Sequence, residues 1–358
     1  MNDLAREILT ILENNKFESY IIGGYPRDKY LGKENKDIDI CTKAKYQDLK
    51  KLFPEIKTNN YSSHLVTYKN EEFEITTFRK EKKYIFNRFP KKIKYTKKLA
   101  QDLKRRDFVI NTLCIDKNDN YIDLNGARQD LDNKIIRLVG NKKSLMKDSL
   151  RTLRAIRFAT TLNFKLDKKL EKAIIKYGYL TKNLSYDRKK QELDKIFESD
   201  NALYGIELIK KFNLQTYLDI NIENIILTEK KGIWAQVIKN DKYKFTKKEA
   251  NSIKIIQKLL NKEFDLYDLY LYGIEIFKIV NTIKQENKNI TKLYNNLPIK
   301  DRSEIEITFF EISNTVYATR KNIGKIYEEI EKQIIYKKIK NEKNAIIRYL
   351  KEELSRIS

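Results

Sequence analysis

The chain has 358 residues, of which 41% are hydrophobic, so packed cores are expected and wholesale disorder is excluded. A single histidine excludes a multi-histidine metal site, and no apolar run is long enough for a transmembrane helix. The net charge of +24 favours a polyanionic partner such as RNA, although a coding bias toward lysine, isoleucine, asparagine and tyrosine is an alternative explanation.

The cysteine usage and the first residues bear on the compartment. Only Cys41 and Cys114 occur, which are too few for a disulfide framework. Residues 1–7 carry acids and no apolar segment, so we expect no secretory signal. Together these features predict a cytoplasmic location.

The N-terminal third is predicted to be a mixed sheet with helices packed on it. Residues 3–15 have the apolar spacing of an amphipathic helix. Short apolar or alternating segments predict strands at 20–22, 37–41 and 73–78, and a hairpin over 113–122.

The rest of the chain has few glycines and prolines and is predicted to be helical. The expected helices are residues 144–161, 167–177, 185–197, 201–212, 247–261, 265–282, 303–315 and 322–356. No fixed repeat period is visible, which argues against a solenoid.

The strongest local signal is a pair of acids that follows a glycine turn. Gly23 and Gly24 would let backbone N–H groups approach a triphosphate, and Arg27 is placed to neutralise it. Asp37 and Asp39 are two apart on a predicted strand, so their carboxylates would share one face. Such hard oxygen ligands suit two Mg²⁺ ions shared with substrate phosphates.

Glu74, on the strand predicted at 73–78, is a candidate third carboxylate. Either a Gly-Gly pair or an Asp-x-Asp pair alone is more often an ordinary turn or an exposed strand than a metal site. Their order and spacing together make the catalytic interpretation the stronger one.

This pattern resembles the first motif of class II tRNA nucleotidyltransferases, in the DNA polymerase β-like superfamily that also includes the bacterial poly(A) polymerases. Four further segments resemble the family's later motifs, in the family's order. They are residues 105–111, then 123–131, then 148–158, and finally 185–193. The five matches cover just over half of the chain.

The resemblance implies that the segment 105–111 binds the nucleotide through Arg106, Asp107 and Asn111. Arginine is a planar donor suited to phosphate and sugar oxygens, and an asparagine side chain can bond a ribose hydroxyl. An isolated Arg-Arg pair would otherwise be taken for a basic surface.

Asp148 and Arg151 are three residues apart on a predicted helix and would project from one face. The carboxylate accepts from an exocyclic amine and the guanidinium donates to a ring nitrogen, which fits cytosine and adenine but not guanine or uracil. The family uses this pair as a protein template for CTP and ATP, whereas the pair alone would pass for a surface salt bridge. Arg154 and Arg157 on the same helix are expected to support the nucleotide site.

The resemblance implies a mixed α/β nucleotidyltransferase head at residues 1–132, a helical neck with base recognition at 133–200, and a helical, tRNA-binding body and tail at 201–358. The implied reaction adds CCA to the 3′ end of tRNA in the acceptor arm, using CTP, ATP and two Mg²⁺ ions, without a nucleic-acid template. We expect neither DNA nor a membrane as a partner.

Residues 79–104 form a basic stretch where the family has a flexible loop that serves the switch from C to A addition. Its length implies CCA or A addition, and A-only addition, CC-only addition and poly(A) synthesis remain alternatives. An RNA-binding scaffold on a degenerate head is the alternative outside enzymes. Lys147 stands where the family often has glutamate, directly before Asp148, and its role is left open.

Overall fold

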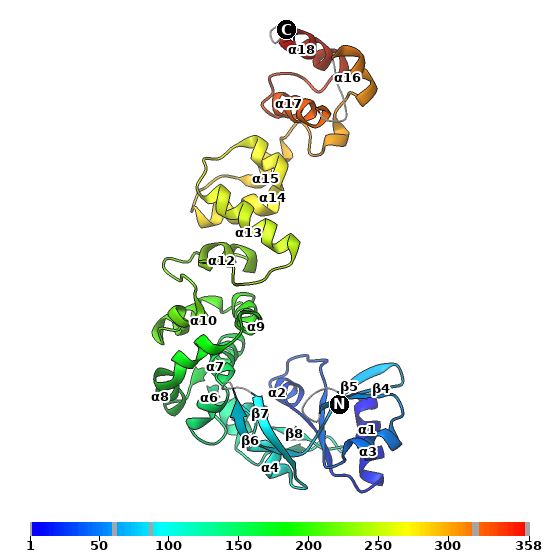
Figure 1. Ribbon diagram of the computed structural model, residues 1–358, viewed down its shortest axis with the longest axis vertical. Helices are drawn as coiled ribbons and strands as arrows, with labels where there is room; N and C mark the ends of the chain where they lie inside the picture. The colour runs from blue at the N-terminus through cyan, green and yellow to red at the C-terminus, as the bar shows by residue number, and fades with distance from the viewer. Residues whose placement is uncertain (1, 59–62, 86–88, 317–321, 355–358) are drawn as a thin grey trace. The chain divides into compact units, whose positions relative to one another are not determined.

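The computed structural model describes residues 2–58, 63–85, 89–316 and 322–354 (Figure 1). Its contacts divide the chain into two compact units, residues 1–220 with 240–243, and residues 221–239 with 244–358. The head, neck and tail boundaries expected at 132 and 200 are not tested by this division and stay predictions. In the part of the chain that the structure describes, no helix is both long and apolar enough to cross a membrane.

The first unit is built on a seven-stranded sheet with the strand order β3-β4-β5-β2-β1-β8-β9. The strands are β1 (Ser19–Ile22), β2 (Asp39–Thr42), β3 (Ile56–Thr58), β4 (Ser63–Tyr68), β5 (Glu71–Thr77), β8 (Cys114–Ile115) and β9 (Tyr121–Ile122). Strands β2 and β5 pair in parallel and the other neighbours pair antiparallel, so the mixed sheet is confirmed.

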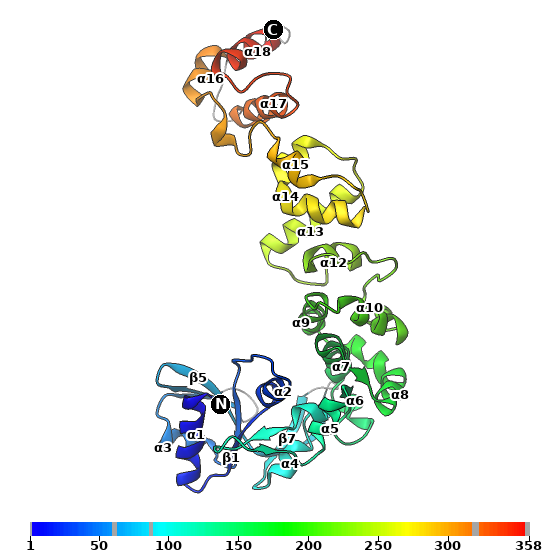
Figure 2. The same ribbon diagram turned by 180° about the vertical axis from the view of Figure 1, so that it is seen from behind.

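Helices cover both faces of this sheet. One face packs on α1 (Asp3–Asn14) and α3 (Tyr46–Leu52), which lie beside the sheet in both views (Figures 1 and 2). The other face packs on α4 (Leu99–Leu103). Successive strand residues alternate between the two cores, as the period of a strand requires: Ile21, Ile40 and Ile115 face α1, and Ile22, Cys41 and Cys114 face α4.

The stretch that we expected to be a loop, residues 79–104, is mostly regular structure. β6 (Arg79–Ile85) and β7 (Phe89–Tyr95) pair antiparallel as a sheet of their own, and α4 follows. The loop prediction is therefore wrong for the described residues. Its aromatic and β-branched residues have high strand propensity, which its many lysines obscured.

The neck helix that we expected over 144–161 is interrupted. It consists of α6 (Lys143–Lys147) and α7 (Leu150–Leu162), and Asp148 between them has extended backbone angles. The Asp148 side chain accepts a hydrogen bond from Leu150 N, at 3.2 Å, and so opens the second helix instead of continuing the first. The prediction that one helix carries both Asp148 and Arg151 is therefore wrong: Asp148 precedes α7 and Arg151 lies within it.

Further short elements complete the first unit. They are α2 (Gly24–Tyr30), the 3₁₀ turn η2 (Val109–Asn111), α5 (Ala127–Asp132), the two-residue parallel strands β10 (Ile135–Ile136) and β11 (Lys165–Leu166), α8 (Lys168–Tyr177), η3 (Gly178–Asn183), α9 (Tyr186–Phe197), α10 (Ala202–Lys211) and α11 (Gln215–Leu218).

The second unit is helical in the residues described. Its elements are α12 (Lys230–Val237), α13 (Lys247–Leu260), α14 (Leu266–Ile283), α15 (Ile290–Asn295), η4 (Arg302–Glu304), α16 (Phe309–Thr315), α17 (Ile323–Ile335) and α18 (Lys343–Leu354). The single helices expected at 303–315 and 322–356 are each divided in two. A capping box at Thr308 and Glu311 starts α16 afresh, which propensity alone did not indicate.

Candidate active site

The glycine turn and the acids of the first motif meet at the end of β1. Gly23 has a φ of +91°, a conformation that L side chains rarely adopt, and it opens helix α2. A Cβ atom added to Gly23 would lie 3.0 Å from Asp39 Oδ2. Glycine is required here because the backbone passes directly against the Asp39 carboxylate.

Three carboxylates gather around the start of β2. Asp39 is in register with Glu74 on the parallel strand β5, and Asp37 lies two residues before, in an exposed segment that precedes the strand. Burial raises the pKa of Asp39, the Glu74 and Asp37 carboxylates add to this rise and Arg106 opposes it, and together they take the pKa from 3.8 to about 6. The strand predicted at 37–41 begins only at Asp39, the first residue of β2.

This charge arrangement fits a divalent cation. Crowded carboxylates with a raised pKa bind protons or metal ions because either removes the repulsion between them. Within the described residues, no group of three or more histidine, cysteine or acidic side chains is arranged to hold an ion by itself. Asp37 and Asp39 stay the predicted cation ligands, which would share the ion with phosphate oxygens of the substrate, and Glu74 stays the predicted third carboxylate.

A chain of polar contacts runs from the glycine turn to the neck. Arg27 is buried and forms a bidentate pair with Asp28, at 2.7 and 2.8 Å. Its Nη1 donates to Asn111 Oδ1 at 2.9 Å, and Asn111 Nδ2 donates to Asp107 Oδ1 at 3.1 Å. Asp107 then accepts from Arg154 Nε on α7 at 2.7 Å. The role of Arg27 toward a triphosphate stays a prediction, and its observed role is to join α2 to η2.

Asp107 is held in its ionised form by this network. Burial alone would raise its pKa, but the guanidinium groups of Arg154 and Arg151 outweigh burial and hold the pKa well below its usual value. The carboxylate is consequently a fixed acceptor at neutral pH.

Phe158 is the apolar centre of the same region. The guanidinium carbons of Arg27, Arg154 and Arg157 lie 5.1, 5.3 and 3.9 Å from its ring centroid. Such cation–π contacts are worth roughly 0.5–2 kcal/mol each. Arg157 also pairs with Glu192 on α9 at 2.6 Å, so it braces the neck.

Asp102 on α4 organises the arginines of the second motif. It is fully buried and accepts from Arg105 Nε at 2.8 Å and from Arg106 Nη2 at 3.3 Å. It also accepts from the backbone N–H of Arg79, the first residue of β6, at 3.0 Å. One carboxylate therefore fixes both arginines and the base of the β6–β7 hairpin.

The proposed base-reading residues lie at the junction of α6 and α7. Arg151 Nε is 3.7 Å from Asp148 Oδ2, which is an ion pair but too long for a hydrogen bond. Arg151 Nη1 and Nη2 donate to the backbone carbonyls of Arg106, at 3.0 Å, and of Arg105. The structure thus brings Arg151 against the second motif, although base reading itself stays a prediction.

Sequence reasoning passed over Asp102 and Phe158. Asp102 stands three and four residues before the two arginines, a spacing that would predict ion pairs on a helix, although α4 ends at Leu103. Phe158 ends the segment 148–158 that resembles the fourth motif, but nothing in the sequence indicates that three arginines would converge on its ring.

Family models match most of the chain. The Poly A polymerase head domain matches residues 19–137, the probable RNA- and SrmB-binding site of polymerase A matches 163–219, and the model of tRNA nucleotidyltransferase domain 2 matches 238–350.

Solved structures share the fold. The Bacillus stearothermophilus CCA-adding enzyme in complex with CTP has a TM-score of 0.82 at 23% identity, covering 99% of this chain and 98% of that one. The Thermotoga maritima CCA-adding enzyme complexed with tRNA has a TM-score of 0.73 at 20% identity, covering 98% and 95%.

Sequence relatives match over nearly their whole length. The CCA-adding enzyme of Lactobacillus helveticus is 30% identical over 97% of this chain and 96% of that protein, and the one of Ligilactobacillus salivarius is 30% identical over 98% and 97%. Identity at this level from end to end, on the fold and motifs described above, means that the chain belongs to the CCA-adding enzymes, a family of tRNA nucleotidyltransferases.

Proposed function

We propose that the protein adds C, C and A to the 3′ end of tRNA, with CTP and ATP as substrates and no nucleic-acid template. The observation that carries this proposal is the contact between the Gly23 turn and Asp39, joined through Arg27, Asn111 and Asp107 to the neck. Similar proteins support it, since solved relatives bind CTP or tRNA.

In the proposed reaction, the 3′-hydroxyl oxygen of the tRNA attacks the α-phosphorus of the nucleotide and pyrophosphate leaves. Asp37 and Asp39 would hold two Mg²⁺ ions, which when bound lower the pKa of the attacking hydroxyl and neutralise the leaving pyrophosphate. Glu74, in register with Asp39 on the parallel strand β5, would assist as the third carboxylate. The Arg106 guanidinium would contact the phosphates or the sugar, and Asp107, fixed by Arg154, would hold Asn111 in place for the ribose.

Base choice would depend on Asp148 and Arg151. The Asp148 carboxylate would accept from the exocyclic amine of cytosine or adenine, and Arg151 would donate to the ring nitrogen beside it. Each Nη atom of Arg151 uses one of its two N–H groups on a head carbonyl, which leaves the others for a bound base. A wrong base offers donors where Arg151 needs an acceptor and leaves buried groups unpaired.

We also propose that the enzyme works in the cytoplasm. Both cysteines, Cys41 and Cys114, are buried free thiols, which suits a reducing compartment.

The test is incorporation of each labelled nucleotide into tRNA that lacks CCA, ends in C, ends in CC, or is complete. We expect C on the first two substrates, A on the third, and none on the complete tRNA. A-only addition, CC-only addition and poly(A) synthesis each give a different pattern and would replace the proposal.

Asp39→Asn should abolish incorporation while tRNA binding survives. Glu72→Gln, an exposed acid on β5, is the matched control and should retain activity. Normal incorporation by Asp39→Asn would refute the role of this acid, and a wild-type protein that binds tRNA without incorporating any nucleotide would favour the scaffold alternative.

A further inference from the structure

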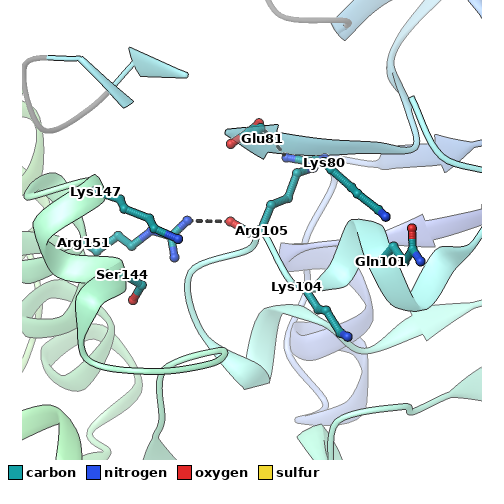
Figure 3. Close-up of a pocket in the computed structure, with 8 residues that line it drawn as sticks. All are labelled: Lys80, Glu81, Gln101, Lys104, Arg105, Ser144, Lys147 and Arg151. Carbon is teal, nitrogen blue, oxygen red and sulfur yellow. Dashed lines mark hydrogen bonds and ion pairs between the residues drawn. The ribbon is translucent and has the colours of Figure 1, made fainter. Parts of the chain in front are cut away.

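A polar pocket of about 310 Å³ lies where the head meets the neck (Figure 3). Its walls come from β6, α4, the second motif, α6 and α7. Figure 3 shows Ser144, Lys147 and Arg151 on one wall and the remaining residues opposite them. The lining residues are Lys80, Glu81, Gln101, Lys104, Arg105, Ser144, Lys147 and Arg151.

The lining carries a strong excess of positive charge. Lys80, Lys104, Arg105, Lys147 and Arg151 contribute five cationic groups against one acid of the lining, and Arg105 and Arg151 also pair with Asp102 and Asp148 outside it. That acid, Glu81, is already neutralised, since it pairs with Arg79 at 2.8 Å and with Arg105 at 3.6 Å. Converging cations with low-dielectric walls concentrate anions.

The pocket also presents donors that the protein does not use. Ser144 Oγ and Arg151 Nε are buried and have no hydrogen-bond partner among the described residues. Arg151 is 8% exposed. Leaving such groups unpaired is unfavourable, and a ligand with acceptor oxygens would satisfy them.

The ligand differs from the triphosphate that the acids would hold. None of Gly23, Gly24, Asp37 or Asp39 lines this pocket, and Asp148 does not either. The incoming nucleotide must place its phosphates at the acids and its base at Asp148. An anion in this pocket would therefore be a separate one, beside Arg151, the predicted base-reading residue.

We propose that this pocket binds a backbone phosphate of the RNA substrate next to its 3′ end. Phosphodiester oxygens match the ammonium and guanidinium donors of the lining. The inference rests on the proposed function and gives Lys147 a role: it clamps the acceptor strand directly before the residue that reads the base.

The test compares two double substitutions with equal loss of charge on the same elements. Lys104→Gln with Lys147→Gln removes two cations from the pocket, whereas Lys98→Gln with Lys143→Gln removes two exposed lysines that flank the same helices outside it. Affinity for tRNA lacking CCA is measured in the full chain by direct titration across a salt series, and KM is measured for tRNA and for CTP.

The pocket variant should bind tRNA about tenfold more weakly, with a salt slope lower by about one to two units, and its KM for CTP should stay within about twofold. The control pair should change these values far less. If the pocket variant raises the KM for CTP and leaves tRNA binding unchanged, the ligand is the nucleotide and the proposal is overturned. Equal effects from both pairs would overturn it too, because general charge would then explain the binding.

Titration needs no turnover, so this result is independent of the reaction. A wild-type protein that binds tRNA but incorporates nothing would refute the proposed function and still leave the phosphate pocket open to the same comparison. Unchanged melting temperatures of both variants would confirm that the substitutions of these surface lysines leave the fold intact.

Discussion

At the scale of single residues, Gly23 is held by two constraints that can be separated. Its positive φ disfavours any side chain, and a Cβ atom would also approach the Asp39 carboxylate to 3.0 Å. Gly32 has a φ of +68° but no atom within 4 Å of such a Cβ. A side chain at either glycine would therefore strain the backbone, but only at Gly23 would it also clash with a neighbouring group.

Gly32→Ala should lower the free energy of unfolding by about 1 kcal/mol and leave kcat near the wild-type value. Gly23→Ala should displace the Asp39 carboxylate, so we expect kcat to fall by about a hundredfold. Steady-state incorporation and urea denaturation of both variants check this. Equal kcat values for the two would show that the clash with Asp39 is irrelevant to catalysis.

Asp39 should also make stability depend on pH in the metal-free protein. Its pKa is about 6 in the folded state against an ordinary 3.8, so the folded state binds the proton more tightly. Its contribution to stability is then complete below about pH 4 and is lost as the pH rises through 6.

Asp39→Asn should therefore stabilise the metal-free protein at pH 8, by roughly 1–3 kcal/mol, with the advantage vanishing near pH 4. Urea denaturation in a chelator at both pH values measures this. Added Mg²⁺ should raise the stability of the wild type and not of the variant. A variant that is less stable than wild type at pH 8 would contradict the like-charge account.

The residue types of the catalytic motif could be predicted from the sequence, but their surroundings could not. Spacing was enough to pair Asp37 with Asp39 as candidates. Arg27 pairs with its neighbour Asp28 but also bonds Asn111, which lies 84 positions further along the chain. Local sequence patterns carry no information on such a distant contact.

At the scale of elements, the β6–β7 hairpin is set apart from the rest of the head. Its two strands pair only with each other in the described residues, and its base is tied to Asp102. Replacing residues 83–92 by a short turn should leave the seven-stranded sheet folded, because no strand of that sheet loses a partner.

The resemblance implies that this hairpin serves the addition of A. At saturating tRNA, we expect the shortened variant to add C at about the wild-type rate and A at least about tenfold more slowly. Product lengths on sequencing gels distinguish the two steps. Equal slowing of both steps would assign the hairpin a general role in binding instead.

The presence of a helix could be predicted where its apolar periodicity was strong. The residues at which helices end could not be predicted. α1, α8, α9 and α13 match the expected ranges closely. The breaks at Asp148 and before Thr308 arise from side chains that bond backbone N–H groups, and these local bonds override helix propensity.

At the scale of the whole molecule, the class of fold followed from the sequence while the strand order did not. β5 pairs in parallel with β2 and antiparallel with β4. Its position between these two strands sets Glu74 beside Asp39. Pairing between distant strands depends on tertiary packing that no local pattern encodes. The division into two units near residue 220 likewise depends on tertiary contacts.

The anchoring of two arginines and one strand by Asp102 has an evolutionary consequence. Since the root of the hairpin is fastened within the protein interior, insertions and deletions toward its tip leave the reaction centre intact. The tip can therefore change while the carboxylates stay in place, and lineages that differ in which nucleotides they append are expected to differ there first.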